Sequence, residues 1–337
     1  MDNPGRSDES ATAIDPALGV TLRNFRGESD YPGMAAALVA SEKADKIERQ
    51  VTPQELASAY QHLTNCDPYQ DLVLAEIAGE VIGYLRGWWW DESAGRLYGL
   101  SGFLAPAWRR RGIGRALLLW GEGRMRRLAA SHPTGQARFF QVDVSHEQAN
   151  KARLLKQAGY QAARYFYQMI RPNLEDIQDL PLPAGVELRA VLPEHYPAIW
   201  TSIDETSRDE WGYTQATQEA YQAWLTNPRF QPHLWQVVWD LATGRVVGHV
   251  LTFIDASENE DFNRKRGYTE GIGVDRAWRR RGLGRALIAR SLLAQKAAGM
   301  SESALVADSE SESGATRLYE GCGFQVLGRS AIYRKPL

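Results

Sequence analysis

The order of hydrophobic and polar positions predicts strands and helices in a pattern that occurs twice along the chain. Each pass begins with a short strand, followed by amphipathic helical segments over residues 31–62 and 194–225. Two alternating strands joined by a short turn come next, at 71–78 with 80–90 and at 233–240 with 245–254. The glycine-containing turns between these strands indicate hairpins.

The second part of each pass is also mixed. A further strand runs into a block rich in arginine and glycine, which opens a long helix. A short apolar strand follows at 138–144 and 303–307, and then another helix and a closing strand. This alternation favours an α/β fold with a mixed sheet (α+β) in each half.

The Arg-Gly block indicates that the chain is an internal duplication. Residues 107–118 read Ala-Trp-Arg-Arg-Arg-Gly-Ile-Gly-Arg-Ala-Leu-Leu, and residues 277–288 repeat them except at two aliphatic positions. Arg111 and Arg281 are 170 positions apart, and a period of that length is too long for a solenoid. We therefore expect two whole domains of one fold.

The composition along the chain predicts where these domains begin and end. Residues 1–17 contain few apolar side chains and are expected to form a disordered tail. Residues 18–170 are the expected first domain and residues 186–337 the second. Residues 171–185 are acidic and proline-rich, as expected of a linker.

The overall composition excludes several classes of protein. The 337 residues include 39 Lys and Arg and 41 Asp and Glu, a net charge of −2, which argues against a nucleic-acid coat or a polybasic membrane binder. Two cysteines cannot form a disulfide framework, and no apolar run approaches the roughly 18 residues that cross a bilayer. No signal peptide is evident at the amino terminus. We expect a cytoplasmic protein without nucleic-acid, membrane or metal partners, and its oligomeric state stays open.

The Arg-Gly block favours an anionic ligand. A helix amino terminus carries partial positive charge and unpaired N–H groups, so acidic residues are expected there, yet each copy has four arginines and no carboxylate. Glycines let the backbone approach a phosphate closely, which favours a phosphate-bearing cofactor over a solvated helix start or a nucleic-acid contact. No Gly-Lys-Ser/Thr follows, and Leu117 or Leu287 stands where a dinucleotide-binding loop has its third glycine.

The block resembles the Arg/Gln-x-x-Gly-x-Gly/Ala motif of the GNAT N-acetyltransferase superfamily. The residues before it, 104–109 and 273–279, are similar to the family's approach strand. Residues 315–324, Ala-Thr-Arg-Leu-Tyr-Glu-Gly-Cys-Gly-Phe, resemble the family's second motif. The resemblance covers nearly all of residues 18–337, as two copies. It implies a splayed mixed sheet in each domain, with acetyl-CoA entering the splay.

The resemblance also implies which residues bind acetyl-CoA and what reaction follows. The reaction is transfer of the acetyl group to the amine of a small molecule by direct attack. It needs a base for the amine, a donor for the oxyanion and an acid for the departing thiolate. The cofactor-binding positions are Ile272, Gly273, Val274, Arg279, Arg280, Arg281, Gly282, Leu283, Gly284 and Arg285 in the second copy, and Leu104, Arg109, Arg110, Arg111, Gly112, Ile113, Gly114 and Arg115 in the first.

The two copies differ at the catalytic positions. Tyr319 stands where the family has its general acid, whereas the first copy has Leu155. Glu270 is the candidate base, on a predicted strand whose alternation places it on the same side as Ile272 and Val274; the matching strand of the first copy has no carboxylate. We predict that the second domain is catalytic and the first is not, as in a tandem member of the family. A packed core tyrosine and a solvated carboxylate remain the alternatives.

The acceptor is expected to bind near Asp209, Glu210, Trp211 and Tyr213, because acidic and aromatic side chains suit a cationic amine. An ordinary helix end with a packed tryptophan is the alternative.

The family's second motif often begins with Asn, which usually contacts the pantetheine arm of the cofactor or caps the helix. This chain has Glu312 at that position, which puts the contact with the pantetheine in doubt. A non-catalytic acyl-CoA-binding sensor or scaffold is the alternative function. The acceptor, the acyl-chain length and cofactor binding by the first domain stay open.

Overall fold

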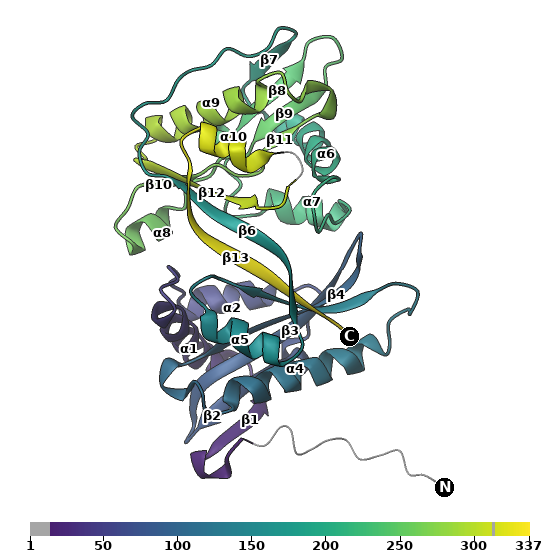
Figure 1. Ribbon diagram of the computed structural model, residues 1–337, viewed down its shortest axis with the longest axis vertical. Helices are drawn as coiled ribbons and strands as arrows, with labels where there is room; N and C mark the ends of the chain where they lie inside the picture. The colour runs from purple at the N-terminus through teal and green to yellow at the C-terminus, as the bar shows by residue number, and fades with distance from the viewer. Residues whose placement is uncertain (1–13, 312–313) are drawn as a thin grey trace. The chain divides into compact units, whose positions relative to one another are not determined.

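The computed structural model of the chain describes residues 14–311 and 314–337. The chain forms two compact units (Figure 1). The first runs to Ala163 and also contains Ala331–Leu337, and the second contains Arg164–Ser330. Of the expected tail, residues 1–13 lie outside the described residues, and Pro16–Leu18 form a short 3₁₀ turn. None of the helices in the described part of the chain is long and apolar enough to cross a bilayer.

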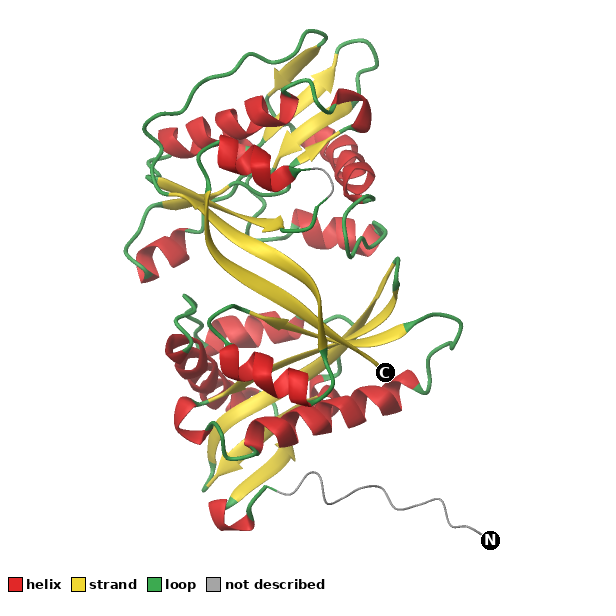
Figure 2. Cartoon of the chain, in the orientation of Figure 1, coloured by secondary structure: helices red, strands yellow, loops and turns green. Residues whose placement is uncertain are grey.

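The first unit is a mixed sheet flanked by helices (Figure 2). Its strands lie in the order β1-β2-β3-β4-β5-β13, with β4 and β5 parallel and the other neighbours antiparallel. The predicted helical segment 31–62 forms two helices, and the predicted hairpin closes at Ala78-Gly79, both with positive φ. The elements are β1 (Val20–Asn24), α1 (Tyr31–Ala44), α2 (Pro53–Gln61), α3 (Pro68–Asp71), β2 (Leu72–Ile77), β3 (Glu80–Glu92), β4 (Gly95–Leu104), α4 (Ile113–Ala129), β5 (Arg138–Val144) and α5 (Ala149–Gln157), with 3₁₀ turns η3 (Glu28–Asp30) and η4 (Pro106–Trp108).

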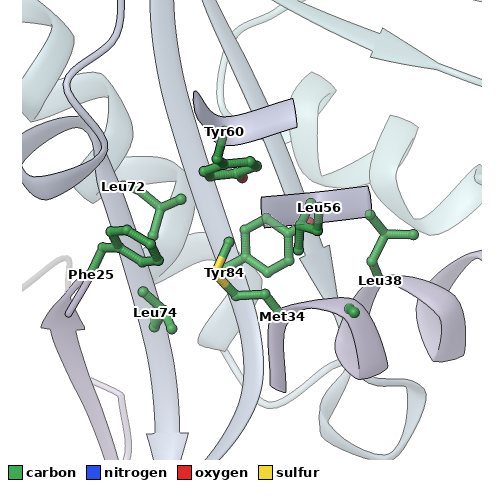
Figure 3. Packing of buried hydrophobic residues seen from close by; sticks show 9 residues of the cluster. Phe25, Met34, Leu38, Leu56, Tyr60, Leu72, Leu74 and Tyr84 are labelled. Atoms are coloured by element: carbon green, nitrogen blue, oxygen red, sulfur yellow. The ribbon is translucent and has the colours of Figure 1, made fainter. Parts of the chain in front are cut away.

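The alternation of side chains along β3 separates the two faces of this sheet. Tyr84 packs with Met34 and Leu38 of α1 and with Leu56 of α2, as Figure 3 shows. The next residue, Leu85, points to the opposite face and lies against Gly121 of α4. The sheet is therefore buried between α1 and α2 on one face and α4 on the other.

The second unit repeats these parts in two sheets, ordered β6-β12-β10 and β11-β9-β8-β7. Along β9, Gly248 lies against α9, whereas the next residue, His249, contacts Ser202 of α6 on the other face. The elements are β6 (Gln161–Arg171), β7 (Val186–Arg189), α6 (Tyr196–Ser207), α7 (Gln218–Leu225), β8 (Gln236–Asp240), β9 (Val246–Val250), α8 (Ala256–Asp261), β10 (Arg266–Tyr268), β11 (Gly273–Val274), α9 (Leu283–Ala297), β12 (Glu302–Asp308), α10 (Ala315–Gly321) and β13 (Gln325–Pro336), with 3₁₀ turns η5 (Pro193–His195), η6 (Pro232–Leu234) and η7 (Arg276–Trp278).

The closing strands of the two copies are exchanged between the units. Residues Phe166–Arg171 of β6 pair with β12 in the second unit, and residues Ala331–Pro336 of β13 pair with β5 in the first. The sequence boundaries 18–170 and 186–337 therefore differ from the compact units at both closing strands. Repeat matching cannot reveal the exchange, because an alternating closing strand suits either sheet equally well.

Side chains also tie the end of the chain to the first unit. Lys335 donates to the carboxylate of Glu122 on α4 at 2.9 and 3.0 Å, and only 1% of the Glu122 side chain is exposed. Arg334 donates to Glu92 on β3 at 2.7 Å. Because buried carboxylates require such partners, the last residues contribute to the stability of the first unit.

Ending the chain at Ser330 should therefore expose β5 of the first unit. We expect hydrogen exchange over residues 138–144 to accelerate by at least about tenfold, equivalent to about 1.4 kcal/mol of protection. Exchange over β8 and β9 should stay unchanged and serves as the internal control. Mass spectrometry of peptides measures both. Loss of protection in β12 rather than β5 would contradict the exchange of closing strands.

Candidate functional site

Two parallel strands diverge in the first unit and open a cavity. β4 pairs with β5 only over Arg96–Gly99, although it stays paired with β3 as far as Leu104. Beyond Gly99, one edge of β4 therefore lacks a neighbouring strand. A cavity of about 480 Å³ lies at this opening, with apolar walls from Leu85, Leu100, Phe103, Leu104, Leu117, Leu118, Val142, Leu154 and Leu155.

The Arg-Gly block forms the same turn in both copies and starts a helix at the same point. Arg110 and Arg280 both have φ +62°, and the helix-capping glycines Gly112 and Gly282 have φ +84° and +83°. A Cβ on either glycine would meet no atom within 4 Å, so glycine is needed there for its backbone angle. No side chain caps either helix. The first N–H groups are thus left for an anion, as expected for a phosphate loop.

The first arginine of each block binds an acidic residue near the end of the first long helix. Arg109 donates to the Asp45 carboxylate at 2.5 and 2.9 Å and to the Ser41 carbonyl and hydroxyl at 2.9 and 2.8 Å. Arg279 pairs likewise with Asp209, at 3.2 Å. Each arginine also donates to a carbonyl of the approach strand, that of Leu104 at 3.3 Å or Val274 at 3.0 Å. These two arginines fix the loop to the helix.

The other arginines have different surroundings. Arg111 lies over the ring of Trp108 at 5.0 Å, and Arg281 over Trp278 at 4.9 Å. Arg110 and Arg280 are exposed. The fourth arginine differs between the copies, because Arg115 lines the cavity whereas Arg285 donates to the Gly321 carbonyl at 2.6 Å.

The cavity of the first unit is lined by more cations than the Arg-Gly block supplies. Arg153 of α5 joins Arg110 and Arg115 in this lining, to which Lys151 also contributes, while Asp45, the one acid among the described residues that line the cavity, is already paired with Arg109. This charge suits a ligand with several phosphates. The contributions of α5 and of the end of α1 were absent from the sequence prediction.

In the second unit the corresponding strand is broken where the sheets diverge. β10 pairs with β12, and β11 pairs with β9, so the run from Tyr268 to Val274 is not one continuous strand. Gly271, between them, has φ +54°. The predicted alternation of Glu270 with Ile272 and Val274 is therefore wrong, because the left-handed residue interrupts the two-residue period.

Glu270 lies at this break and is half-buried. Burial raises the pKa of Glu270; Arg229 opposes the shift and Glu258 reinforces it. The Glu270 carbonyl accepts from the Leu251 N–H at 2.8 Å, which holds the backbone beside β9. A carboxyl with a raised pKa in a strand break can exchange a proton nearer to neutral pH than an ordinary glutamate.

The residues after the break pack tightly. Ile272 contacts both apolar clusters of the unit, the one around Leu305 and the one around Val247. A Cβ on Gly273 would collide with the His249 ring and the Thr206 hydroxyl, so only glycine fits there. β11 is an edge strand whose single partner among the described residues is β9.

Tyr319 lies on α10 with its ring packed in the apolar cluster that contains Leu305 and Phe324, and 8% of the residue is exposed. Burial raises the pKa of Tyr319 to about 12, and the charges of Glu210 and Cys322 act in the same direction. The hydroxyl therefore stays protonated at neutral pH and can donate. Glu312, which stands where the family often has Asn, lies outside the described residues, and the cap position of α10 is Gly314.

The predicted acceptor residues have separate neighbours. Asp209 pairs with Arg276 and Arg279, on the side of β11. The Trp211 ring lies 6.2 Å from that of Phe166, whose register partner is Asp308 at the end of β12. The segment 209–211 thus reaches from the side of β11 to the end of β12, and Glu210 lies between these two strands. Burial raises the pKa of the Glu210 carboxyl, and the negative charge of Asp308 raises it further.

Tyr213 has a supporting position in this segment. Its hydroxyl donates to Asp204 at 2.7 Å, and Asp204 also accepts from the Ala216 N–H at 3.2 Å. Tyr213 therefore holds the loop that follows α6.

The sequence model of the acetyltransferase (GNAT) family matches residues 39–160 and 197–324, one match in each copy. The chain belongs to this family. The architecture confirms the predicted α/β fold with two GNAT domains, and the protein is an acyltransferase with an arrangement similar to that of mycothiol synthase.

Individual relatives agree with this assignment. Mycothiol acetyltransferase of Salinispora arenicola is 28% identical over 276 residues, which cover 80% of this chain and 82% of that protein. Its counterpart in Salinispora tropica is 31% identical over 221 residues, covering 65% and 67%. A GCN5-related N-acetyltransferase from Sphaerobacter thermophilus has TM-score 0.75 at 25% identity, covering 94% and 95%. A tandem GNAT protein from the clavulanic acid biosynthesis pathway shares the fold, with TM-score 0.68 at 17% identity, covering 94% and 98%.

Replacing Asp209 by Asn should loosen the segment across the splay without unfolding the unit. Asp209 and its partner Arg276 are exposed, so their ion pair should contribute little to global stability. We expect faster hydrogen exchange at the amides of Glu210 and Tyr213, whose bonds lie in this segment, and a nearly unchanged Tm. Asp261→Asn, at an exposed helix end, is the matched control. Equal exchange in both variants would show that the ion pairs do not hold the segment.

Proposed function

We propose that the protein is an acetyl-CoA-dependent N-acetyltransferase that acetylates a small amine by direct attack, with the chemistry in the second unit. The observation that carries this proposal is the difference between matched positions. Glu270 and Tyr319 of the second unit correspond to Leu100 and Leu155 of the first, and both leucines are buried in the cavity wall. Only the second copy has groups at these positions that can accept or donate a proton.

Each group has a defined task in this reaction. An amine is nucleophilic only when neutral, so Glu270 takes its proton, directly or through water. The edge of β11 that no described strand covers offers backbone groups to the oxyanion. Tyr319, kept protonated by its buried position, donates to the departing thiolate.

Acetyl-CoA fits the Arg-Gly loops by the chemistry of their donors. The uncapped N–H groups of α4 and α9 suit its pyrophosphate. The apolar wall and cationic rim of the first-unit cavity suit a pantetheine arm and phosphates, so we propose that the first unit also binds acetyl-CoA. A carrier or sensor role for that unit is favoured by Leu155, which cannot donate a proton.

The acceptor is proposed to enter the second unit beside Glu210 and Trp211. A carboxylate and an aromatic ring across the splay suit a protonated amine. The residue that follows the aspartate bound to the first arginine is Lys46 in the first copy and Glu210 in the second, so the charge beside this ion pair is reversed. The mycothiol acetyltransferases among the relatives favour an acceptor related to mycothiol, which is the narrower alternative for the substrate.

Tyr319→Phe should lower turnover about 10²- to 10³-fold while leaving acetyl-CoA binding intact, because only the proton donor is lost. Free-thiol release over a panel of amines measures turnover, and calorimetry measures binding. Tyr333→Phe, a buried tyrosine of the first unit, is the control. Full activity of Tyr319→Phe would remove this residue from the mechanism, and absence of acetyl-CoA binding by the wild type would refute the proposed function.

Glu270→Gln should remove the acid limb of the pH profile of kcat/KM. The raised pKa of Glu270 favours its protonated form, so the wild-type rate should fall as pH drops through a value above the usual 4.3 of glutamate. The variant should be slow and insensitive over the same range. Glu260→Gln, an exposed residue of α8, is the control. An unchanged acid limb in Glu270→Gln would exclude this carboxyl as the base.

A further inference from the structure

The cavity of the first unit contains a primary amine that the proposed reaction does not use. Lys151 lies in α5 and is the one lysine among the described residues that line this cavity. It precedes Leu155 by four residues, so both side chains lie on the same face of the helix. Leu155 holds the position that Tyr319 has in the second unit, where the proposed donor to the thiolate lies.

The Lys151 amine lacks a partner. Within the described part of the chain it makes no hydrogen bond or ion pair, whereas Lys335 binds Glu122 and Lys296 binds Glu175 at 3.3 Å. Burial lowers the pKa of Lys151, opposed by the charges of Asp143 on β5 and of Glu42 and Asp45 in and after α1. A larger share of this amine is therefore neutral, and so nucleophilic, than of an exposed lysine.

The neighbours of Lys151 identify the side of the cavity on which it lies. Glu42 and Asp45 belong to the end of α1, the element that corresponds to the end of α6 and to Asp209 and Glu210, where the acceptor is proposed to enter the second unit. In the second unit, the residue one turn before Tyr319 is Ala315, which has no amine. Lys151 thus supplies, from within the chain, the functional group that the second unit takes from its substrate.

We propose that Lys151 is an internal acetyl acceptor, modified by acetyl-CoA held in the same cavity. The inference rests on the proposed binding of acetyl-CoA. The ammonium first releases a proton to solvent. The neutral Nζ then attacks the thioester carbonyl and the N–C bond forms. As the C–S bond breaks, Nζ releases a second proton to water, and the thiolate leaves and takes a proton from water. The product is an uncharged acetamide. This transfer happens once per chain, since no described group of the cavity could hydrolyse an amide.

The test is to incubate the full-length protein with acetyl-CoA in the absence of any amine and to map the acetylated peptides over time. Lys151 should gain one acetyl group at least about tenfold faster than Lys156, an exposed lysine of the same helix, because the bound thioester reacts within the complex. Gly112→Trp, which blocks the phosphate loop, should slow Lys151 to the rate of Lys156. Lys151→Arg should show no rapid acetylation.

Three results would overturn the proposal: equal rates at Lys151 and Lys156, a rate at Lys151 that Gly112→Trp leaves unchanged, or no acetyl group on Lys151 when calorimetry shows acetyl-CoA bound. The wild-type measurement does not depend on how well any variant folds. Thiol release with an external amine is measured on the same preparation. It distinguishes a protein whose Lys151 is not acetylated from a protein that is not an N-acetyltransferase at all. Retained turnover without a modified Lys151 refutes the internal acceptor alone.

Discussion

Both candidate sites depend on the point where one strand stops pairing with its parallel neighbour. A strand that leaves its neighbour exposes backbone donors and acceptors that need other partners, so such a divergence is costly unless something fills it. The two copies diverge by different means. In the first, β4 stays paired with β3 as far as Leu104, whereas its pairing with β5 ends at Gly99. In the second, the chain breaks at Gly271 and moves from one sheet to the other.

The first arginine of each Arg-Gly block connects this opening to the rest of its unit. It binds a carbonyl of the approach strand just before it and an acid near the end of the first long helix, 64 residues earlier in the first copy and 70 in the second. It thus joins the loop and its strand to a segment that is distant in sequence. The loop glycines can then hold their left-handed angles, because the arginine side chain fixes the backbone on the amino-terminal side. A block that reads as a run of four equivalent cations therefore contains side chains with different surroundings.

Much of the fold was predictable because it follows from local patterns. Local sequence determines the hairpins, the strand 138–144 and the glycine turn before α4 and α9. Because the chain is duplicated, each of these patterns occurs in both copies and supports the same prediction. The break at Gly271 was missed because a glycine inside an alternating run does not reveal its φ. The partners Asp45 and Asp209 were missed because ion pairs across the fold leave no local signal. The α5 wall of the cavity was missed because Leu155 was considered only for the proton it cannot donate.

The exchanged closing strands have a consequence for how the duplicated chain can change. Two separable copies could lose one by deletion as soon as its chemistry became dispensable. Here, deleting the first half would remove the strand that completes the β12 sheet, and the last residues of the chain would lose the sheet in which they pair. The first copy therefore has a structural role in completing the second, separate from any chemistry of its own. Loss of either copy would leave an unpaired strand edge in the other, so the two halves can change by substitution more readily than by deletion.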